Sequence, residues 1–419
     1  MDQTTPRDHT SRMQAIALLL VLLWSVYCLN GFRPPTQAIE LSDADAGSAL
    51  RQALFGGSAL LSAVLLWMNR TLWPSIRTHW SWCLFAVWVL LSVLYTEQTG
   101  TTLKRAVLLC CGLTTAVFAV STLTKRPLVG TVWTIAGICA GVSVMSLVWM
   151  IALPAEITTN PGRPGLAGIS NHPNTLAPAC AIGCALFCVL QARTRLAIAA
   201  KGFGFVSCLV ALILTGSVTS LFLALVGMSI AILIVLGGYA GVISGVLLFS
   251  GVVAITIMGP AAVSEMIFQS VDRDPSMSGR DQLWAIIWEQ VQIHPLFGHG
   301  WGAFWTEGKG RELVQSWNPR QSHNAFLDIM LDIGFVGLVI LLIPITQTIM
   351  NGIKLRDPSI NKDTRRAIAG GLGVVTSLLL VYGLQQSFLG KPDSFVFAVF
   401  LCIAIAISNE VRGMSSISA

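Results

Sequence analysis

Apolar runs about as long as a membrane-spanning helix recur along most of this chain. A helix needs about 20 mostly apolar residues to cross the hydrocarbon of a bilayer. The pattern predicts twelve such helices, near residues 13–32, 49–68, 79–96, 105–123, 129–153, 174–192, 202–217, 219–237, 241–261, 325–349, 367–388 and 394–410. We therefore expect an all-α integral membrane protein with about twelve transmembrane helices.

One long polar interval, residues 263–324, interrupts this apolar pattern. Within it, residues 281–293 read DQLWAIIWEQVQI. Their apolar positions recur at helical spacing and predict an amphipathic helix that lies against the membrane surface or caps a cavity. His294 and Pro295 end that helix, and the glycines of the following FGHGWGAFW predict turns. Chemistry is expected in this interval, where His294, His299 and His323 are three of the six histidines.

Composition agrees with a membrane environment. Hydrophobic residues make up 54% of the 419 residues and charged residues only 11%, whereas about a quarter of a soluble domain is charged. We attribute the net charge of +6 to basic residues in cytoplasmic loops. No stretch interleaves aromatic and basic residues as a nucleic-acid surface does, so we expect no nucleic-acid partner.

The ten cysteines all fall in apolar stretches. Cys180, Cys184 and Cys188 share one helix face, which raises the alternative of a metal or haem site. Neither histidine nor a carboxylate accompanies them, so small packing residues are the favoured interpretation. The spacing predicts neither a disulfide framework nor a zinc site.

Basic residues orient the predicted helices, because cytoplasmic loops carry an excess of lysine and arginine. With the N-terminus inside, the cytoplasmic segments hold more than twice as many basic residues as the short outer segments. Both termini are therefore expected in the cytoplasm and the polar interval outside. The chain then divides into helices one to four (1–128), helices five to nine with an outer loop at 154–174 (129–262), the large outer loop (263–324), and helices ten to twelve with a cytoplasmic tail (325–419).

Two arginines on the predicted outer side are candidates for binding an anion. Arg163 lies between Gly162 and Pro164 in the outer loop at 154–174, and Arg280 follows Gly279 in the large loop. Glycine lets a ligand approach the backbone, and arginine clamps phosphate with paired donors. The alternative is an interfacial arginine whose side chain reaches the lipid headgroups.

Histidines and carboxylates supply the other candidates. His323, at the mouth of the tenth helix, could accept a proton from a hydroxyl or hold it by hydrogen bonding, or it could cap the helix together with Asn324. Asp328 and Asp332 follow within the apolar part of that helix, where charges usually face a cavity or a partner. They could bind an acceptor, orient His323 or pair with arginines. His172 could line the same cavity or bond to the local backbone.

Four pieces, in this order, resemble the O-antigen ligase/polymerase superfamily, whose shared region is often called the Wzy_C domain. They are RPGLAGISNHPNTLA (163–177), SGRDQLW (278–284), HPLFGHGWGAFW (294–305) and SHNAFLDIMLDIGFVGLVI (322–340). Together with the twelve-helix pattern, the resemblance covers roughly residues 130–350.

The resemblance implies a GT-C-like membrane glycosyltransferase at the periplasmic face of the bacterial inner membrane, with one large periplasmic loop that contains short amphipathic helices. Such enzymes transfer a glycan from undecaprenyl diphosphate to an acceptor hydroxyl, with inversion and without metal, nucleotide or other cofactor. Ligases use lipid A–core as the acceptor, and polymerases use another lipid-linked repeat unit. By this resemblance Arg280, on the diphosphate, and His323, on the acceptor hydroxyl, are catalytic. The predicted substrate-binding residues are Arg163, His172, Asn324 and Asp328.

One position departs from the superfamily's pattern. Members often carry a basic residue at an outer helix end before the large loop, where this chain has Val218. Arg163 is our candidate for the missing phosphate contact. The GHGWGAFW and LDIMLDIGFVG segments resemble exopolysaccharide-type polymerases and favour a surface-polysaccharide polymerase over a ligase.

Two other classes of protein remain as alternatives. A flippase for lipid-linked oligosaccharides would need charges through the helix interiors and some pseudo-symmetry, but the polar residues of this chain gather on one face. A structural membrane scaffold would not need arginine and histidine grouped at one outer site. We therefore expect the partners to be a lipid-linked glycan donor, a glycan or lipid A–core acceptor, and membrane lipid.

Overall fold

The computed structural model describes residues 6–30, 49–69, 72–123, 126–154, 158–160, 163–170, 172–237, 280–306, 310, 319–355 and 360–415. For Arg51, Arg163 and Arg280 it describes the backbone alone. The helices are α1 (Pro6–Asn30), α2 (Ala49–Met68), α3 (Trp73–Thr78), α4 (Trp80–Leu91), α5 (Thr99–Leu123), α6 (Pro127–Ala152), α8 (Pro173–Val189), α9 (Arg195–Leu214), α10 (Val218–Leu236), α12 (Arg280–Ile293), α13 (Ala325–Lys354), α14 (Lys362–Ser377) and α15 (Phe395–Ser415). A 3₁₀ turn, Ser92–Leu94, follows α4, and a π-helical turn, Leu378–Tyr382, follows α14.

The predicted all-α membrane fold is confirmed. Eight helices in the described ranges are long and apolar enough to cross a membrane, and three shorter apolar helices accompany them. Every predicted apolar run coincides with a helix except 241–261, which lies outside the described residues. Strands β1 (Thr159–Asn160) and β2 (Arg163–Leu166) add a small antiparallel hairpin in the loop at 154–174.

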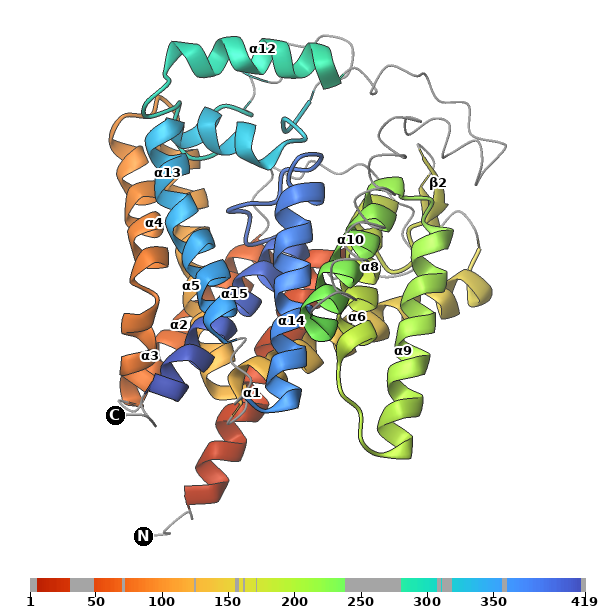
Figure 1. The fold of residues 1–419 in the computed structure, drawn as a ribbon. Helices are drawn as coiled ribbons and strands as arrows, with labels where there is room; N and C mark the ends of the chain where they lie inside the picture. The colour runs from red at the N-terminus through yellow and green to blue at the C-terminus, as the bar shows by residue number, and fades with distance from the viewer. Residues whose placement is uncertain are drawn as a thin grey trace.

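The helices form a bundle with α12 lying across one end (Figure 1). We call this end the α12 face. The start of α1 and the end of α15 lie at the opposite end, which agrees with the predicted placement of both termini on one side and the large polar interval on the other. Arg193, just before α9, and Asp363, in the first turn of α14, form an ion pair at 2.8 Å at the end opposite α12.

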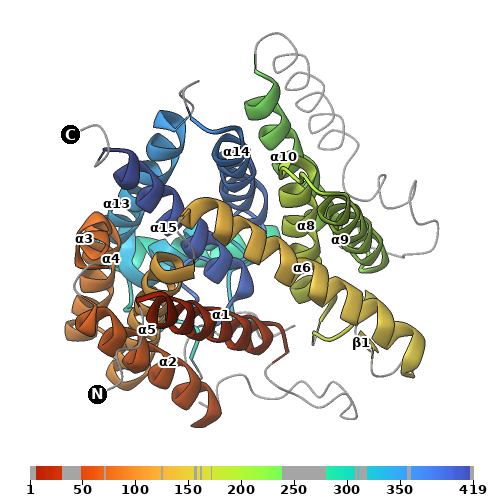
Figure 2. The ribbon, with the colours of Figure 1, turned by 90° about the horizontal axis from the view of Figure 1, so that it is seen from below.

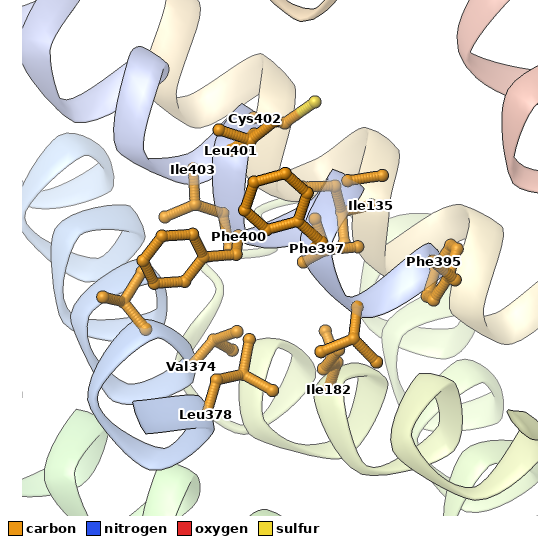
Figure 3. Packing of buried hydrophobic residues seen from close by; sticks show 14 of the residues in the cluster. Ile135, Ile182, Val374, Leu378, Phe395, Phe397, Phe400, Leu401, Cys402 and Ile403 are labelled. Carbon is orange, nitrogen blue, oxygen red and sulfur yellow. The ribbon is translucent and has the colours of Figure 1, made fainter. Parts of the chain in front are cut away.

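Helix α15 is the centre of the bundle. Viewed from the end opposite α12, it lies among α5, α6, α13 and α14 (Figure 2). Its residues 395–407 are all buried, as expected for a helix that is apolar on every side. Phe397 and Phe400 stack at its core with ring centroids 6.4 Å apart, and Ile135 and Ile182 approach from α6 and α8 (Figure 3). This packed centre supports the polar turns that join the helices at the α12 face.

Helix α13 is broken at Gly334, which the sequence did not predict. Gly334 has φ 69° and ψ −173°, so α13 consists of two segments. The first, 325–333, lies beneath α12, and the second, 335–354, descends through the bundle (Figure 1). Asp328 and Asp332 were expected inside a spanning helix. The structure places both in α13, in the first segment before the break and next to the α12 face.

Candidate functional site

Helix α12 packs onto the first segment of α13. Its Leu283, Ile287 and Val291 recur every four residues, so they share one face. That face is buried against a small apolar cluster of its own, which includes Trp305 and Leu331. The predicted amphipathic helix 281–293 is thus present as α12, and it covers the beginning of α13.

The turn after α12 supplies hydrogen bonds to the break in α13. The backbone N–H groups of His299 and Gly300 donate to the carbonyls of Leu331 and Asp332 at 2.9 and 2.8 Å. In the opposite direction, the N–H of Phe335 donates to the carbonyl of Pro295 at 2.8 Å. A helix break leaves backbone groups without helical partners, and the 294–300 turn satisfies these. The predicted turn structure of FGHGWGAFW is confirmed.

Tyr95 anchors the same turn from the segment between α4 and α5. Its hydroxyl donates to the carbonyl of Phe297 at 2.8 Å. Burial, with a smaller contribution from the nearby Asp332 carboxylate, raises the pKa of Tyr95 to about 12. The hydroxyl therefore stays protonated at neutral pH and remains a hydrogen-bond donor.

Asn324 begins α13 as its N-cap. Its side-chain oxygen accepts from the N–H groups of Phe326 and Leu327 at 3.0 and 3.2 Å. The hydroxyl of Ser322 in turn accepts from the N–H of Asn324 at 3.0 Å. The structure therefore gives Asn324 the capping role that the sequence left open, and its substrate-binding role stays a prediction.

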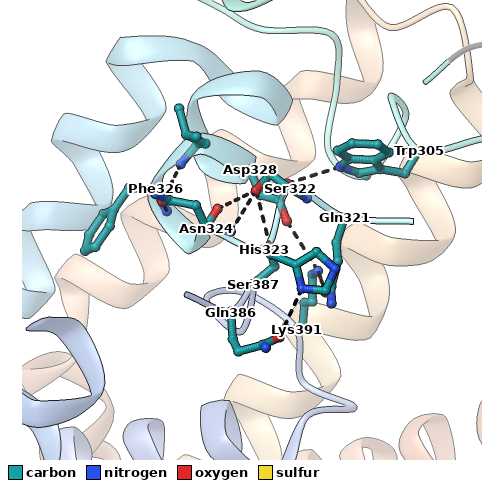
Figure 4. A network of polar contacts seen from close by, with 12 residues as sticks. Trp305, Gln321, Ser322, His323, Asn324, Phe326, Asp328, Gln386, Ser387 and Lys391 are labelled. Atoms are coloured by element: carbon teal, nitrogen blue, oxygen red, sulfur yellow. Dashed lines mark hydrogen bonds and ion pairs between the residues drawn. The ribbon is translucent and has the colours of Figure 1, made fainter. Parts of the chain in front are cut away.

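Asp328 is the centre of a polar network at this face (Figure 4). Its Oδ1 accepts from the N–H of Ser322 at 3.0 Å and from the indole N–H of Trp305 at 3.1 Å. Its Oδ2 lies 3.5 Å from Nζ of Lys391. Protein groups contact both carboxylate oxygens of Asp328. This geometry therefore favours the alternative in which Asp328 orients the segment that bears His323. Binding of substrate by Asp328 remains a prediction.

His323 lies between Ser322 and Asn324 with an uncommon backbone conformation. Its φ is 55°, the one positive φ of a non-glycine residue among the described residues. Histidine adopts this left-handed region more readily than most residues do. Its Nδ1 lies 3.4 Å from Oε1 of Gln386, and the ring points toward Gln321 and Lys391 (Figure 4). The adjoining cap and the Asp328 network thus fix the backbone on both sides of His323, and Gln386 contacts its imidazole.

The turn between α14 and α15, residues 383–394, completes this site. The carbonyl of Gly383 accepts from the N–H of Ala325 at 2.7 Å, so the turn is joined to the start of α13. Gln385 Oε1 accepts from the hydroxyl of Thr219 at 2.6 Å, which joins it to the first turn of α10. Val218, where the superfamily pattern has a basic residue, therefore lies beside this turn.

The two predicted arginines belong to elements at the same face. Arg280 begins α12, one helical turn before Trp284, whose indole N–H donates to the carbonyl of Ser322 at 2.9 Å. Arg163 begins β2, and at Gly165 this strand passes so close to the carbonyl of Thr215 that no side chain would fit. The structure thus brings the backbone of Arg280 near the His323 segment and the strand of Arg163 to the turn before Val218.

His172 has a local role in the structure. It is the N-cap of α8, and its Nδ1 accepts from the N–H of Asn174 at 3.0 Å. This is the second of the two roles considered for it from the sequence. A contact between His172 and substrate remains a prediction.

Sequence reasoning missed Gln386 and Lys391, which the 383–394 turn places beside His323 and Asp328. Neutral amides carry no motif, and the sequence identifies Lys391 only as one of the basic residues on the predicted outer side. The sequence signal that could have found these two residues is the predicted position of their turn. The segment GLQQSFLGKPDS is a polar joint between the last two helices, on the same side as the large loop.

The part of the chain that matches a known family includes the central part of this site. Residues 180–342 match the family model Wzy_C, described as O-antigen ligase. This part of the chain is similar to the O-antigen ligases. The predicted resemblance to the O-antigen ligase/polymerase superfamily is confirmed. The O-antigen ligase region contains α12, His323, Asn324 and Asp328, whereas Arg163, His172 and the 383–394 turn lie outside it.

One curated protein shows a related sequence. Over 135 residues the chain is 25% identical to the exopolysaccharide production protein ExoQ of Rhizobium meliloti (strain 1021). The aligned part is 30% of this chain and 30% of ExoQ. The chain thus spans less than a third of the length of this relative.

Proposed function

We propose that this protein is a glycosyltransferase that extends a surface polysaccharide at the periplasmic face of the bacterial inner membrane. The donor is a glycan on undecaprenyl diphosphate, and the acceptor is a sugar hydroxyl of another lipid-linked repeat unit. The observation that carries the proposal is the placement of His323, which belongs to the O-antigen ligase region and is held at the α12 face by a cap and a buried carboxylate network. The similarity to ExoQ favours a polymerase.

The contact to Gln386 suggests how His323 acts. The carbonyl oxygen of an amide can only accept a hydrogen bond, so we assign the tautomer with the proton on Nδ1 of His323, which can donate in the 3.4 Å contact with Gln386 Oε1. In the neutral imidazole, Nε2 then keeps its lone pair. In the proposed reaction, Nε2 accepts the proton of the acceptor hydroxyl as its oxygen attacks the anomeric carbon.

The other half of the reaction is departure of the carrier. The bond between the anomeric carbon and the phosphate oxygen breaks with inversion, and undecaprenyl diphosphate leaves with the bonding electrons. A diphosphate is a good leaving group, so the protein needs only to stabilise the developing negative charge. Arginines aimed at that charge lower the barrier, and Arg280 and Arg163 are the residues we propose for this task.

A ligase is the second candidate, because the matching family model is described as O-antigen ligase. Reconstitution in vesicles with lipid-linked repeat units, with and without lipid A–core, separates the two. A polymerase is expected to lengthen the glycan on its carrier in the absence of lipid A–core. Transfer to lipid A–core without growth on the carrier would replace the proposal with a ligase, and no transfer in either case would overturn both.

Removal of metal ions is expected to leave transfer unchanged, since the proposed reaction uses only arginines and histidine. The measurement is the rate of glycan transfer before and after treatment of the vesicles with EDTA. Inhibition that added Mg²⁺ or Mn²⁺ reverses would contradict this mechanism.

A further inference from the structure

Lys391 is the cation whose described side chain takes part in the network around His323 (Figure 4). Its Nζ lies 3.3 Å from Oε1 of Gln321 and 3.5 Å from Oδ2 of Asp328. The lysine side chain is 38% exposed, whereas that of Asp328 is 8% exposed. The ammonium group therefore lies at the open side of the network, and the carboxylate lies inside it.

Asp328 does not depend on Lys391 for its hydrogen bonds. Two N–H donors, from Ser322 and Trp305, already contact its Oδ1 at 3.0 and 3.1 Å. The contact with Lys391 is longer, and a partly exposed ion pair of this kind contributes little to stability. This arrangement indicates that the Asp328 carboxylate positions the ammonium group of Lys391. It does not indicate that Lys391 is needed to neutralise Asp328.

The ammonium group can accommodate a further anion. It carries three N–H donors, and the two long contacts with Gln321 and Asp328 engage two of them. Lysine binds phosphate as a compact point charge. A donor that brings its anomeric carbon within reach of His323 would bring its phosphates next to that carbon, and Lys391 is in the same network as His323.

We propose that Lys391 binds the diphosphate of the lipid-linked donor beside His323, with Gln321 and Asp328 holding its ammonium group in position. This inference rests on the proposed function, because it takes a polyprenyl diphosphate as the ligand. The cation comes from the turn between α14 and α15, outside the O-antigen ligase region at residues 180–342. The donor site would thus include residues beyond that region.

The test compares the binding of undecaprenyl diphosphate and undecaprenyl phosphate to purified protein in detergent. Lys391→Gln is expected to weaken binding of the diphosphate by about tenfold or more, because it removes a charge-assisted contact. Lys391→Arg should retain most of the affinity. In the transfer assay, Lys391→Gln should raise the KM for the donor and leave the KM for the acceptor unchanged. Arg193→Gln is the matched control, because Arg193 pairs with Asp363 at the opposite end of the bundle.

Introducing Lys391→Gln into an Asp328→Asn protein separates ligand binding by Lys391 from a purely structural role. If Lys391 only pairs with Asp328, Lys391→Gln should cause no additional loss in an Asp328→Asn protein. If it binds the diphosphate, the loss should persist there. Thermal melting of each variant reports whether the fold is kept. Wild-type affinity in Lys391→Gln, or a loss that disappears in the Asp328→Asn background, would overturn the inference alone. A wild-type protein that binds no undecaprenyl diphosphate would overturn the proposed function as well.

Discussion

Replacing His323 with asparagine should reduce glycan transfer by about 10²- to 10⁴-fold, the usual contribution of a general base, while binding of the lipid-linked donor persists. Asparagine is the informative substitution because it tolerates the left-handed backbone that His323 adopts at φ 55°. Alanine would add backbone strain of about 1–2 kcal/mol and would confuse a loss of chemistry with a loss of structure. The measurement is turnover in reconstituted vesicles, with donor binding measured separately.

His294→Asn is the matched control for this substitution. His294 is exposed at the end of α12, where its ring contacts His299, and the Asp328 network does not include it among the described contacts. Transfer should therefore remain close to wild type. Unchanged turnover in His323→Asn would assign His323 to the local structure at the start of α13 and would remove the proton-accepting step from the mechanism.

Replacing Gly334 with alanine should strongly destabilise the protein. The backbone at Gly334 is left-handed, and a side chain there would meet the carbonyl of Leu296. Backbone strain alone costs about 1–2 kcal/mol, and relief of the clash requires movement of the 294–300 turn. We expect a lower melting temperature in detergent and faster proteolysis within that turn, because its hydrogen bonds to Leu331, Asp332 and Phe335 would be lost.

Gly137→Ala in α6 provides the comparison for this prediction. A Cβ at Gly137 meets nothing within 4 Å, and alanine favours a helix over glycine by about 1 kcal/mol. Its melting temperature should stay the same or rise slightly. Equal melting temperatures for Gly334→Ala and wild type would show that α13 does not need the break at this position.

The helices could be predicted because crossing a bilayer demands long apolar runs, but the break in α13 could not. In LDIGFVGLVI, Gly334 and Gly337 both stand in an apolar stretch, and nothing local distinguishes them. The distinction comes from Leu296 and its neighbours, which are distant in sequence and occupy the space beside Gly334 alone. A tertiary contact of this kind leaves no periodic pattern along the chain.

The same reasoning explains which parts of the site were predictable. His323, Asn324 and Asp328 lie within six residues on one polar-to-apolar boundary, so their proximity follows from local sequence. Gln386 and Lys391 reach the same place only because α14 rises beside α13 and a π-helical turn, Leu378–Tyr382, precedes the 383–394 turn. Their roles depend on the packing of whole helices, and the sequence around them contains no recognisable motif.

The break at Gly334 also shortens the continuous helix that α13 offers to a bilayer. An unbroken α13 of 30 residues would be about 45 Å long, at about 1.5 Å per residue, and hydrocarbon about 30 Å thick could hold it only with a steep tilt or local thickening. The segment after the break, 335–354, is about 30 Å long by the same measure. The remaining turns of α13 lie beneath α12 at the end of the bundle, so the break separates the polar start of α13, next to His323, from a segment that is itself long enough to span hydrocarbon.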